Sequence, residues 1–359
     1  MESKVYHDFF KLVRAGIDHS KEVPPTDIDW RAIRAIAEQQ GLYAIVIDGI
    51  EKLPENYRPK QDLLLEWIGE VLQGYEYYYD AYKKTIAEMA RFYNSLGYKM
   101  MILKGYTCSL NWPKPEHRPC GDIDIWLFGK QKEADFFVAK EKGIEIDNSH
   151  HHHTIFNWGD FIVENHYDFV NVHTNRTNAQ LEVIFKELGK DDSHFIELHG
   201  EKVYLPSPDL HALFLLRHAI IEFAATGISL RQLLDWAFFW EKHSKEVDEM
   251  WLCDLLEKHH MTTFFNIINA ICVKELGFQS TIFHSVKYIP HMKDRVLKEI
   301  LQPEFDWLKA HDKNVIKRIL FKYRRWKGGV WKRELCFGES SLESFIWGVK
   351  SHLLKPASI

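Results

Sequence analysis

Two aspartates, Asp122 and Asp124, begin the sequence Asp-Ile-Asp-Ile-Trp-Leu-Phe, in which isoleucine or leucine fills every second position. This alternation predicts a strand over 122–128, on which residues two apart project from the same face. Two neighbouring carboxylates repel each other unless a cation lies between them. Oxygen donors on a rigid strand suit Mg²⁺, which binds one or two carboxylates together with substrate phosphates. The pattern therefore predicts a metal site for phosphoryl or nucleotidyl transfer.

A short apolar run precedes the aspartates and ends in a lysine and a glycine. Met-Met-Ile-Leu at 100–103 predicts a buried strand, and Lys104-Gly105 predicts the turn by which the chain leaves it. Arg118 lies in a proline-broken loop directly ahead of the aspartates. A functional role for Lys104 and Arg118 is no better supported than the simpler interpretation, in which they are a surface lysine after a strand and an arginine in a loop.

Two extended segments, 150–156 and 161–170, predict a hairpin through Asn-Trp-Gly-Asp. If residues 158–159 form the centre of the turn, His153 lies opposite Glu164. A turn one residue longer changes this pairing. Alternation then places five polar side chains on one face: His151, His153, Glu164, His166 and Asp168.

Four consecutive histidines, His150–His153, begin this hairpin. On a strand they alternate faces, so that at most two of them can share a metal ion. Histidines beside carboxylates act more often as hydrogen-bond partners than as ligands, and no second cluster with ligand spacing appears. A zinc hydrolase that uses this strand is therefore the weakest of three hypotheses for the function.

Taken together, these segments resemble the polymerase-β-like nucleotidyltransferases, and within them a family of poorly characterised bacterial nucleotidyltransferases. The superfamily pattern is a strand, a glycine turn into a helix, a strand with Asp-x-Asp, and a third carboxylate on a neighbouring strand. The matching segments are Leu103-Lys104-Gly105, Arg118, Gly121-Asp122-Ile123-Asp124 and Val163-Glu164-Asn165-His166, with C-terminal helical patterns at 213–218 and 230–236.

The resemblance implies an enzyme that transfers a nucleoside monophosphate from a nucleoside triphosphate to an acceptor. Asp122, Asp124 and Glu164 would bind Mg²⁺ or Mn²⁺, and Glu164 is also the possible general base. Asp168 is the second choice for the third carboxylate. The resemblance leaves the acceptor open among a small molecule, an RNA and a protein.

The turn departs from the superfamily, which usually has a second small residue where this chain has Tyr106. A small residue lets backbone N–H groups approach a triphosphate. By the resemblance Gly105 binds the triphosphate, with Lys104 and Arg118 as additional phosphate contacts. Tyr106 motivates a second hypothesis, a nucleotidyltransferase-fold protein that binds without turnover.

The predicted fold class is α+β, a small mixed-sheet nucleotidyltransferase core with helical regions on both sides. The predicted domains are an N-terminal helical region, 1–96, the core, 97–205, and a C-terminal helical domain, 206–359. Helical spacing predicts helices over 30–50 and 62–96, and a strand is expected near 195–205.

Composition restricts the class of protein further. The 359 residues carry a net charge of −5, which argues against a surface that binds anions throughout. Five scattered cysteines predict reduced thiols, and Cys108 and Cys120 lack a paired base in the sequence. Arg217, His218 and Glu222 interrupt the most apolar helix, so that it cannot span a bilayer. We expect a cytoplasmic protein.

A basic segment, 313–333, carries nine Lys or Arg and no acid, with aromatic residues interleaved. Such a segment can bind a nucleic-acid backbone and stack bases, or lie on an anionic membrane surface. Alternatively, the segment is a helical cap whose aromatic side chains pack inward while its charges stay in water, and we favour this interpretation. In the second hypothesis, this segment is the surface that contacts nucleic acid. The sequence contains no short motif that indicates a base preference or an oligomeric state.

Overall fold

The computed structural model describes residues 4–20, 27–283, 289–304, 323–324, 326–338, 340, 342–343 and 345–347. Contacts divide the chain into two compact units. A unit that we call the helical unit comprises 1–71, 216–244 and 249–341, and the sheet unit comprises 72–215 with the short segments 245–248 and 342–359.

The helical unit is built from helices of 8 to 14 residues whose apolar faces pack together. Two of them, α1 and α3, approach so closely that a Cβ atom at Gly49 would lie 2.2 Å from the Leu12 carbonyl oxygen. The helices that lie wholly within this unit are α1 (Lys4–Gly16), α2 (Trp30–Gln40), α3 (Tyr43–Glu51), α4 (Gln61–Val71), α10 (Leu230–His243), α11 (Glu249–Lys258), α12 (Thr262–Lys274), α13 (Pro290–Leu301) and α15 (Val330–Phe337).

The helix expected over 30–50 is wrong as a single element, because the chain forms α2 and α3 instead. Gly41 ends α2 in the left-handed conformation, with φ of 66°, and its N–H closes the last turn on the carbonyl groups of Ala37 and Glu38. Glycine adopts this conformation without the strain that a Cβ atom adds.

The long helix expected over 62–96 is confirmed, with a change of winding in its middle. The chain runs through α4, a π-helical stretch η2 (Leu72–Tyr77), and α5 (Tyr78–Ser95). The division between the helical unit and the sheet unit falls between Val71 and Leu72, where the π-helix begins.

The sheet unit contains one mixed sheet of six strands in the order β3-β4-β2-β1-β6-β5. The pairs β2–β4 and β1–β6 are parallel, and the other three pairs are antiparallel. The strands are β1 (Met101–Ile102), β2 (Ile123–Trp126), β3 (His153–Trp158), β4 (Phe161–His166), β5 (Phe195–Leu198) and β6 (Glu201–Tyr204). This mixed sheet with helical flanks confirms the predicted α+β class.

The strand expected near 195–205 is two strands, β5 and β6, joined by a tight turn at His199 and Gly200. Both turn residues have positive φ, 50° and 81°. Two successive positive φ values are typical of the turns that connect antiparallel strands. The His-Gly pair was the sequence signal for this turn.

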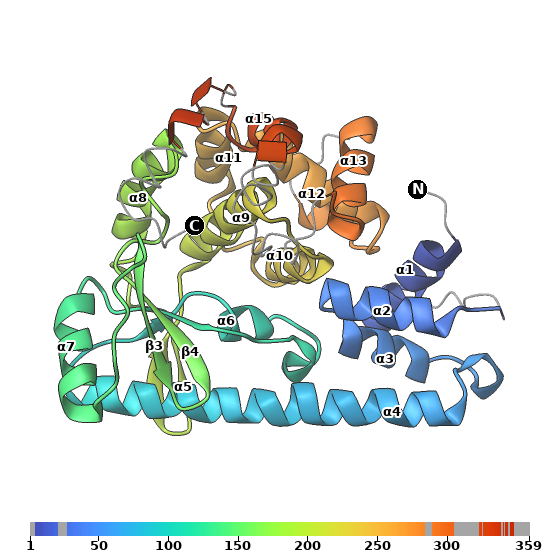
Figure 1. Cartoon of the computed structure of the whole chain (residues 1–359), viewed down its shortest axis with the longest axis horizontal. Helices are drawn as coiled ribbons and strands as arrows, with labels where there is room; N and C mark the ends of the chain where they lie inside the picture. The colour runs from blue at the N-terminus through green and yellow to red at the C-terminus, as the bar shows by residue number, and fades with distance from the viewer. Residues whose placement is uncertain are drawn as a thin grey trace. The chain divides into compact units, whose positions relative to one another are not determined.

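One face of the sheet forms the apolar core of the sheet unit. It packs against α5 and α7 (Gln131–Lys142), and Figure 1 shows α5 crossing the hairpin of β3 and β4. The Tyr82 ring meets Phe161 at 5.4 Å between centroids, and Phe92 meets Trp158 at the same distance. Such aromatic burial supplies a large part of a domain's hydrophobic stabilisation.

The opposite face of the sheet is covered in part by α8 (Arg176–Leu188) and by the first two turns of α9 (Pro208–Ala225). The Phe169 ring links Trp126 of β2, at 4.5 Å, to Phe185 of α8 and Phe214 of α9. Two short helices, α6 (Tyr106–Ser109) and η3 (Pro115–His117), lie between β1 and β2 in the chain. Within the described ranges, no helix is both long and apolar enough to cross a membrane.

Candidate metal and phosphate site

The central feature of the site is a carboxylate pair on neighbouring parallel strands. Asp124 of β2 lies directly beside Glu164 of β4 in the strand register. Their neighbours Ile123, Ile125 and Val163 belong to the apolar core on the other face. Because side chains alternate along a strand, both carboxylates project from the face opposite the core.

Asp124 is buried, with 1% of its side chain exposed, and it has two cationic neighbours. Its Oδ1 atom lies 3.1 Å from the Lys104 ammonium and 3.1 Å from Nε2 of His166. A buried carboxylate is stable only when positive charge or hydrogen bonds compensate it. Lys104, which directly follows β1 and Leu103, supplies one of these charges.

Glu164 and His166 each change the pKa of the other. His166 is buried, which lowers its pKa, but its contacts with Asp124 and Glu164 outweigh burial and raise the pKa to about 9. Burial raises the pKa of Glu164, yet the close contact with His166 and the charge of Lys104 hold that pKa well below its usual range. The Nδ1 atom of His166 donates to the Asp168 carbonyl oxygen at 3.1 Å. His166 is therefore positioned as an imidazolium that donates from both nitrogens.

Asp122, the other expected ligand, lies in a bend just before β2 and is exposed to solvent. Partial desolvation and the charges of Asp124 and Glu164 raise the pKa of its carboxyl group. Among the described residues, one compact set of possible ligands, with atoms within 4.8 Å of one another, comprises Asp124, Glu164 and His166. The structure thus brings two of the three predicted ligands into one cluster and leaves Asp122 at its open edge.

This ligand set fits a divalent cation. Two carboxylates supply the hard oxygen donors that Mg²⁺ and Mn²⁺ prefer, and Asp122 adds a third at the solvent side. His166 is the member that the sequence prediction placed on the correct face without assigning it a contact with the carboxylates. Its spacing of two residues from Glu164 was the available signal.

The predicted register of the hairpin is wrong, because the turn begins one residue later than predicted. Gly159 and Asp160 form the turn, so that His153 lies opposite His166, and Ile155 lies opposite Glu164. The turn still has two residues but begins one residue later than expected, which moves each pairing partner by two positions. The parity of the strands is unchanged, and His153, Glu164 and His166 still share one face.

Gly105 forms the turn after β1 in a conformation that only glycine adopts readily. Its φ is 66° and its ψ is −100°, and a Cβ atom there would lie 2.6 Å from the Tyr82 hydroxyl oxygen. That hydroxyl donates a hydrogen bond to the Asp122 carbonyl oxygen at 2.9 Å. Tyr82, which the sequence prediction did not single out, therefore ties α5 to the turn and to the start of β2.

Tyr106 packs away from the turn and into the core. Its ring is 4% exposed and lies 6.0 Å from the Tyr79 ring of α5. The side chain that departs from the superfamily pattern is therefore buried beneath the Gly105 turn. The backbone geometry of the turn is set by Gly105 and not by a second small residue.

Arg118 lies beside a small pocket between the helical segment 74–79 and the loop before β2. The guanidinium group is buried and donates to the Pro119 carbonyl oxygen at 3.0 Å. The pocket has a volume of about 140 Å³, below the roughly 300–1,000 Å³ of sites that enclose a whole small ligand. It is therefore too small to enclose a whole small molecule. Its lining is Gly74, Tyr75, Tyr78, Tyr79, Arg118, Pro119 and Cys120.

A buried polar network on the core face holds the hairpin in place. Asp135 of α7 accepts hydrogen bonds from Asn165 at 2.7 Å and Thr154 at 2.8 Å, and also from Gln131. Asn165 and Thr154 face each other across β4 and β3, next to Glu164. Asp135 thus fixes the strand that carries Glu164, a role that the sequence prediction did not assign to it.

Two further predictions concern residues near the site. Cys108 does have a histidine neighbour, His211, with 3.8 Å between Sγ and Nε2, which corrects the expectation of no paired base. Both side chains are buried, so that a substrate cannot reach the sulfur. Asp168, the second choice for a ligand, pairs with Lys186 of α8.

The basic segment 313–333 is described only in part. Trp331 packs on Phe223 at 5.8 Å between centroids, and Lys332 lies 2.5 Å from Glu299. These contacts agree with the helical-cap interpretation for the end of the segment. Five of its basic residues lie outside the described residues: Lys313, Lys317, Arg318, Lys322 and Arg325.

A small mixed sheet between helices, with carboxylates paired across neighbouring strands, is the architecture expected of a nucleotidyltransferase core. Residues 26–277 match the family described as "Uncharacterised nucleotidyltransferase". The match spans more than half of the chain, which therefore belongs to this family of nucleotidyltransferases.

Comparison with solved structures finds an antigenic nucleotidyltransferase-like protein from Paracoccidioides brasiliensis. It is 16% identical in sequence, with a TM-score of 0.33, over 56% of this chain and 96% of that chain. A TM-score this low carries no structural argument. Among curated proteins, none matches the chain.

Proposed function

We propose that the chain transfers a nucleoside monophosphate from a nucleoside triphosphate to an acceptor, as in the polymerase-β-like enzymes that its motifs resemble. The observation that carries the proposal is the parallel register of Asp124 and Glu164, with Asp122 beside them. Membership of a nucleotidyltransferase family supports the same reaction class. The acceptor oxygen would form a bond to the α-phosphorus while the bond to pyrophosphate breaks.

We assign Asp122, Asp124 and Glu164 to the binding of Mg²⁺ or Mn²⁺. Such an ion would neutralise the charge that develops on the transferring phosphoryl group. The lowered pKa of Glu164 keeps it ionised, which suits a ligand better than a general base. His166 would hold Asp124 in place by donating to its carboxylate, and its charge would attract Glu164, whose nearest oxygen lies 3.7 Å from Nε2.

We assign the triphosphate to the Gly105 turn, with Lys104 as its cationic partner. The Lys104 side chain is 24% exposed, and its ammonium group lies 3.1 Å from Asp124. A metal ion bound by Asp124 would replace that ion pair and leave the ammonium for a phosphate oxygen. Arg118, held within its own loop, would instead shape the adjoining pocket.

Calorimetric titration of the full chain with each Mg-nucleoside triphosphate tests the proposal. We expect one nucleotide to bind, and the double substitution Asp122→Asn and Asp124→Asn to weaken it at least about tenfold, the change expected when metal contacts are lost. Asp160→Asn, in the exposed hairpin turn, is the matched control and should bind like the parent. Equal binding by the double variant, or no binding of any nucleotide, would refute the assignment.

A further inference from the structure

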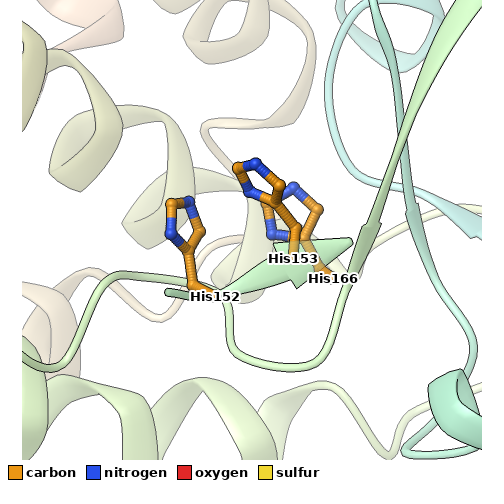
Figure 2. A group of neighbouring side chains, drawn as sticks. All are labelled: His152, His153 and His166. Atoms are coloured by element: carbon orange, nitrogen blue, oxygen red, sulfur yellow. The ribbon is translucent and has the colours of Figure 1, made fainter. Parts of the chain in front are cut away.

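Three histidines converge where β3 begins and β4 ends. His152, His153 and His166 each offer one ring nitrogen, and these atoms lie within 4.8 Å of one another. The ring centroids are 4.3 Å apart for His152 and His153, and 5.3 Å apart for His153 and His166. Figure 2 shows the three rings on the same side of the strand.

The hairpin register explains why neighbouring histidines meet here. His153 is the first residue of β3 and lies opposite His166, the last residue of β4. His152 precedes the strand, so that the alternation of faces expected for consecutive residues does not apply to it. Its carbonyl oxygen accepts from the N–H groups of Tyr167 and Asp168, at 3.0 and 3.1 Å. The backbone directly after β4 therefore fixes His152 beside the other two rings.

His153 is the residue that most clearly needs a ligand. It is 6% exposed, and both of its ring nitrogens are buried without a hydrogen-bond partner among the described residues. The carboxylate oxygen of Glu164 lies 3.7 Å from Nδ1, beyond hydrogen-bond distance. Burial of a polar group without a partner is energetically unfavourable. Such groups in a folded protein point to a bound ion or water.

We propose that His152, His153 and His166 form a second cation site, for a transition-metal ion of the Zn²⁺ class. Neutral imidazole nitrogens bind Zn²⁺ well and Mg²⁺ poorly, whereas the neighbouring carboxylates prefer Mg²⁺. Three protein nitrogens leave a fourth position of a tetrahedral ion open to water or another ligand. The site does not depend on the transfer reaction proposed above.

The two cation sites share His166, whose Nε2 atom faces Asp124 and whose Nδ1 atom faces the Asp168 carbonyl group. A metal ion that binds either nitrogen displaces the proton held there, replaces one of these contacts and changes the charge of the ring that faces Asp124. Occupation of the histidine site therefore changes the support that His166 gives to Asp124. This coupling makes the histidine site a means by which a transition metal alters the carboxylate site.

Titration of the chelator-treated full chain with Co²⁺ alone tests the site, because tetrahedral Co²⁺ gives a visible absorption spectrum that octahedral Co²⁺ lacks. We expect one equivalent to bind with a tetrahedral spectrum, and Zn²⁺ but not excess Mg²⁺ to displace it. His153→Gln should weaken binding at least about tenfold, since loss of even an outer partner of a ligand costs 10–100-fold. His152→Gln, at the half-buried position, should do the same and guards against a folding defect in the first variant.

His150→Gln is the matched control, because His150 belongs to the same run and stacks on His153 at 4.9 Å but lies outside the three-ligand group. It should bind Co²⁺ like the parent. Equal losses in His150→Gln and His153→Gln, or equally tight binding by the urea-unfolded chain, would show adventitious binding by a histidine run and overturn the site.

Asp124→Asn separates this proposal from the transferase proposal. The variant should keep the tetrahedral Co²⁺ spectrum while nucleotide binding is lost, because Asp124 belongs only to the carboxylate cluster. Loss of the Co²⁺ spectrum in Asp124→Asn would place the ion among the carboxylates and refute a separate histidine site. Failure of nucleotide binding in the parent, with the Co²⁺ spectrum intact, would refute only the transferase proposal.

Discussion

Substitution of Gly105 by alanine should disturb the fold and the start of β2 together. The conformation, φ 66° and ψ −100°, lies outside the left-handed helical region, and such backbone strain costs about 1–3 kcal/mol in a residue with a Cβ atom. The new Cβ atom would also lie 2.6 Å from the Tyr82 hydroxyl group. Displacing that hydroxyl breaks its hydrogen bond to the Asp122 carbonyl oxygen, and loss of such a bond costs a buried group about 1–3 kcal/mol. We expect a total loss of about 2–6 kcal/mol in the free energy of unfolding.

The double variant Gly105→Ala with Tyr82→Phe separates the two contributions. Without the hydroxyl group, the nearest atoms to the new Cβ are the Asp122 carbonyl oxygen at 3.5 Å and the ring carbon at 3.7 Å, which are ordinary contacts. The double variant should therefore be more stable than the sum of the single changes predicts, by about 1 kcal/mol. Urea unfolding followed by circular dichroism measures all three variants.

Gly143→Ala is the matched control, because Gly143 also has positive φ but lies in the left-handed helical region with open space around it. It should cost about 1 kcal/mol. Additive costs in the double variant, within about 0.5 kcal/mol, would refute the steric contact with Tyr82. A cost for Gly105→Ala equal to that for Gly143→Ala would refute the whole account of this turn.

Three other perturbations test separate parts of the structure. Gly49→Ala should destabilise the helical unit by about 2–4 kcal/mol in thermal or urea unfolding, because its Cβ atom would lie 2.2 Å from the Leu12 carbonyl oxygen. Burial raises the pKa of Glu182 to about 7, so that the folded chain keeps a proton that the unfolded chain loses near pH 4.5. Relative to Glu182→Gln, the parent should therefore lose up to about 3 kcal/mol of stability from pH 5 to 8. Lys104→Met should weaken nucleotide binding in calorimetry about tenfold, and the buried carboxylate of Asp124 should make the ligand-free chain less stable by about 1–3 kcal/mol.

Each of these changes has a control on the same kind of element. Gly69→Ala, in α4 with nothing near its Cβ atom, should be neutral or stabilising, and a loss as large as for Gly49→Ala would contradict the close crossing of α1 and α3. Glu187→Gln, exposed on α8, should leave the pH profile unchanged. Lys130→Met removes an exposed lysine and should bind nucleotide like the parent; the same loss there as in Lys104→Met would point to a general charge effect.

The strand that carries Asp124 could be predicted because its pattern is local. Alternation of isoleucines with aspartates sets the faces of the strand, and the structure keeps Ile123 in the core and Asp124 opposite it. The local pattern could not predict the pairing of Asp124 with Glu164, because 40 residues separate them and parallel pairing depends on the tertiary fold. Resemblance, and not spacing, supplied Glu164.

The errors arose where a single residue decides the backbone. Gly41 divides one apolar helical pattern into two helices, and the pair His199-Gly200 divides one extended pattern into two strands. The hairpin register depended on whether Asp160 belongs to the turn, which the strand pattern leaves open. Tyr82 and Asp135 were not predicted because their roles consist of contacts with distant strands.

The order of the two units along the chain has a consequence for synthesis. Residues 72–215, which carry the whole sheet, are contiguous and emerge from the ribosome before the second half of the helical unit. Because domains generally fold as units during synthesis, the sheet can assemble while residues 1–71 still await α10 to α13. A nascent chain arrested after residue 215 should therefore already contain the carboxylate pair in its final register, with α1 to α4 still lacking the later helices of their unit.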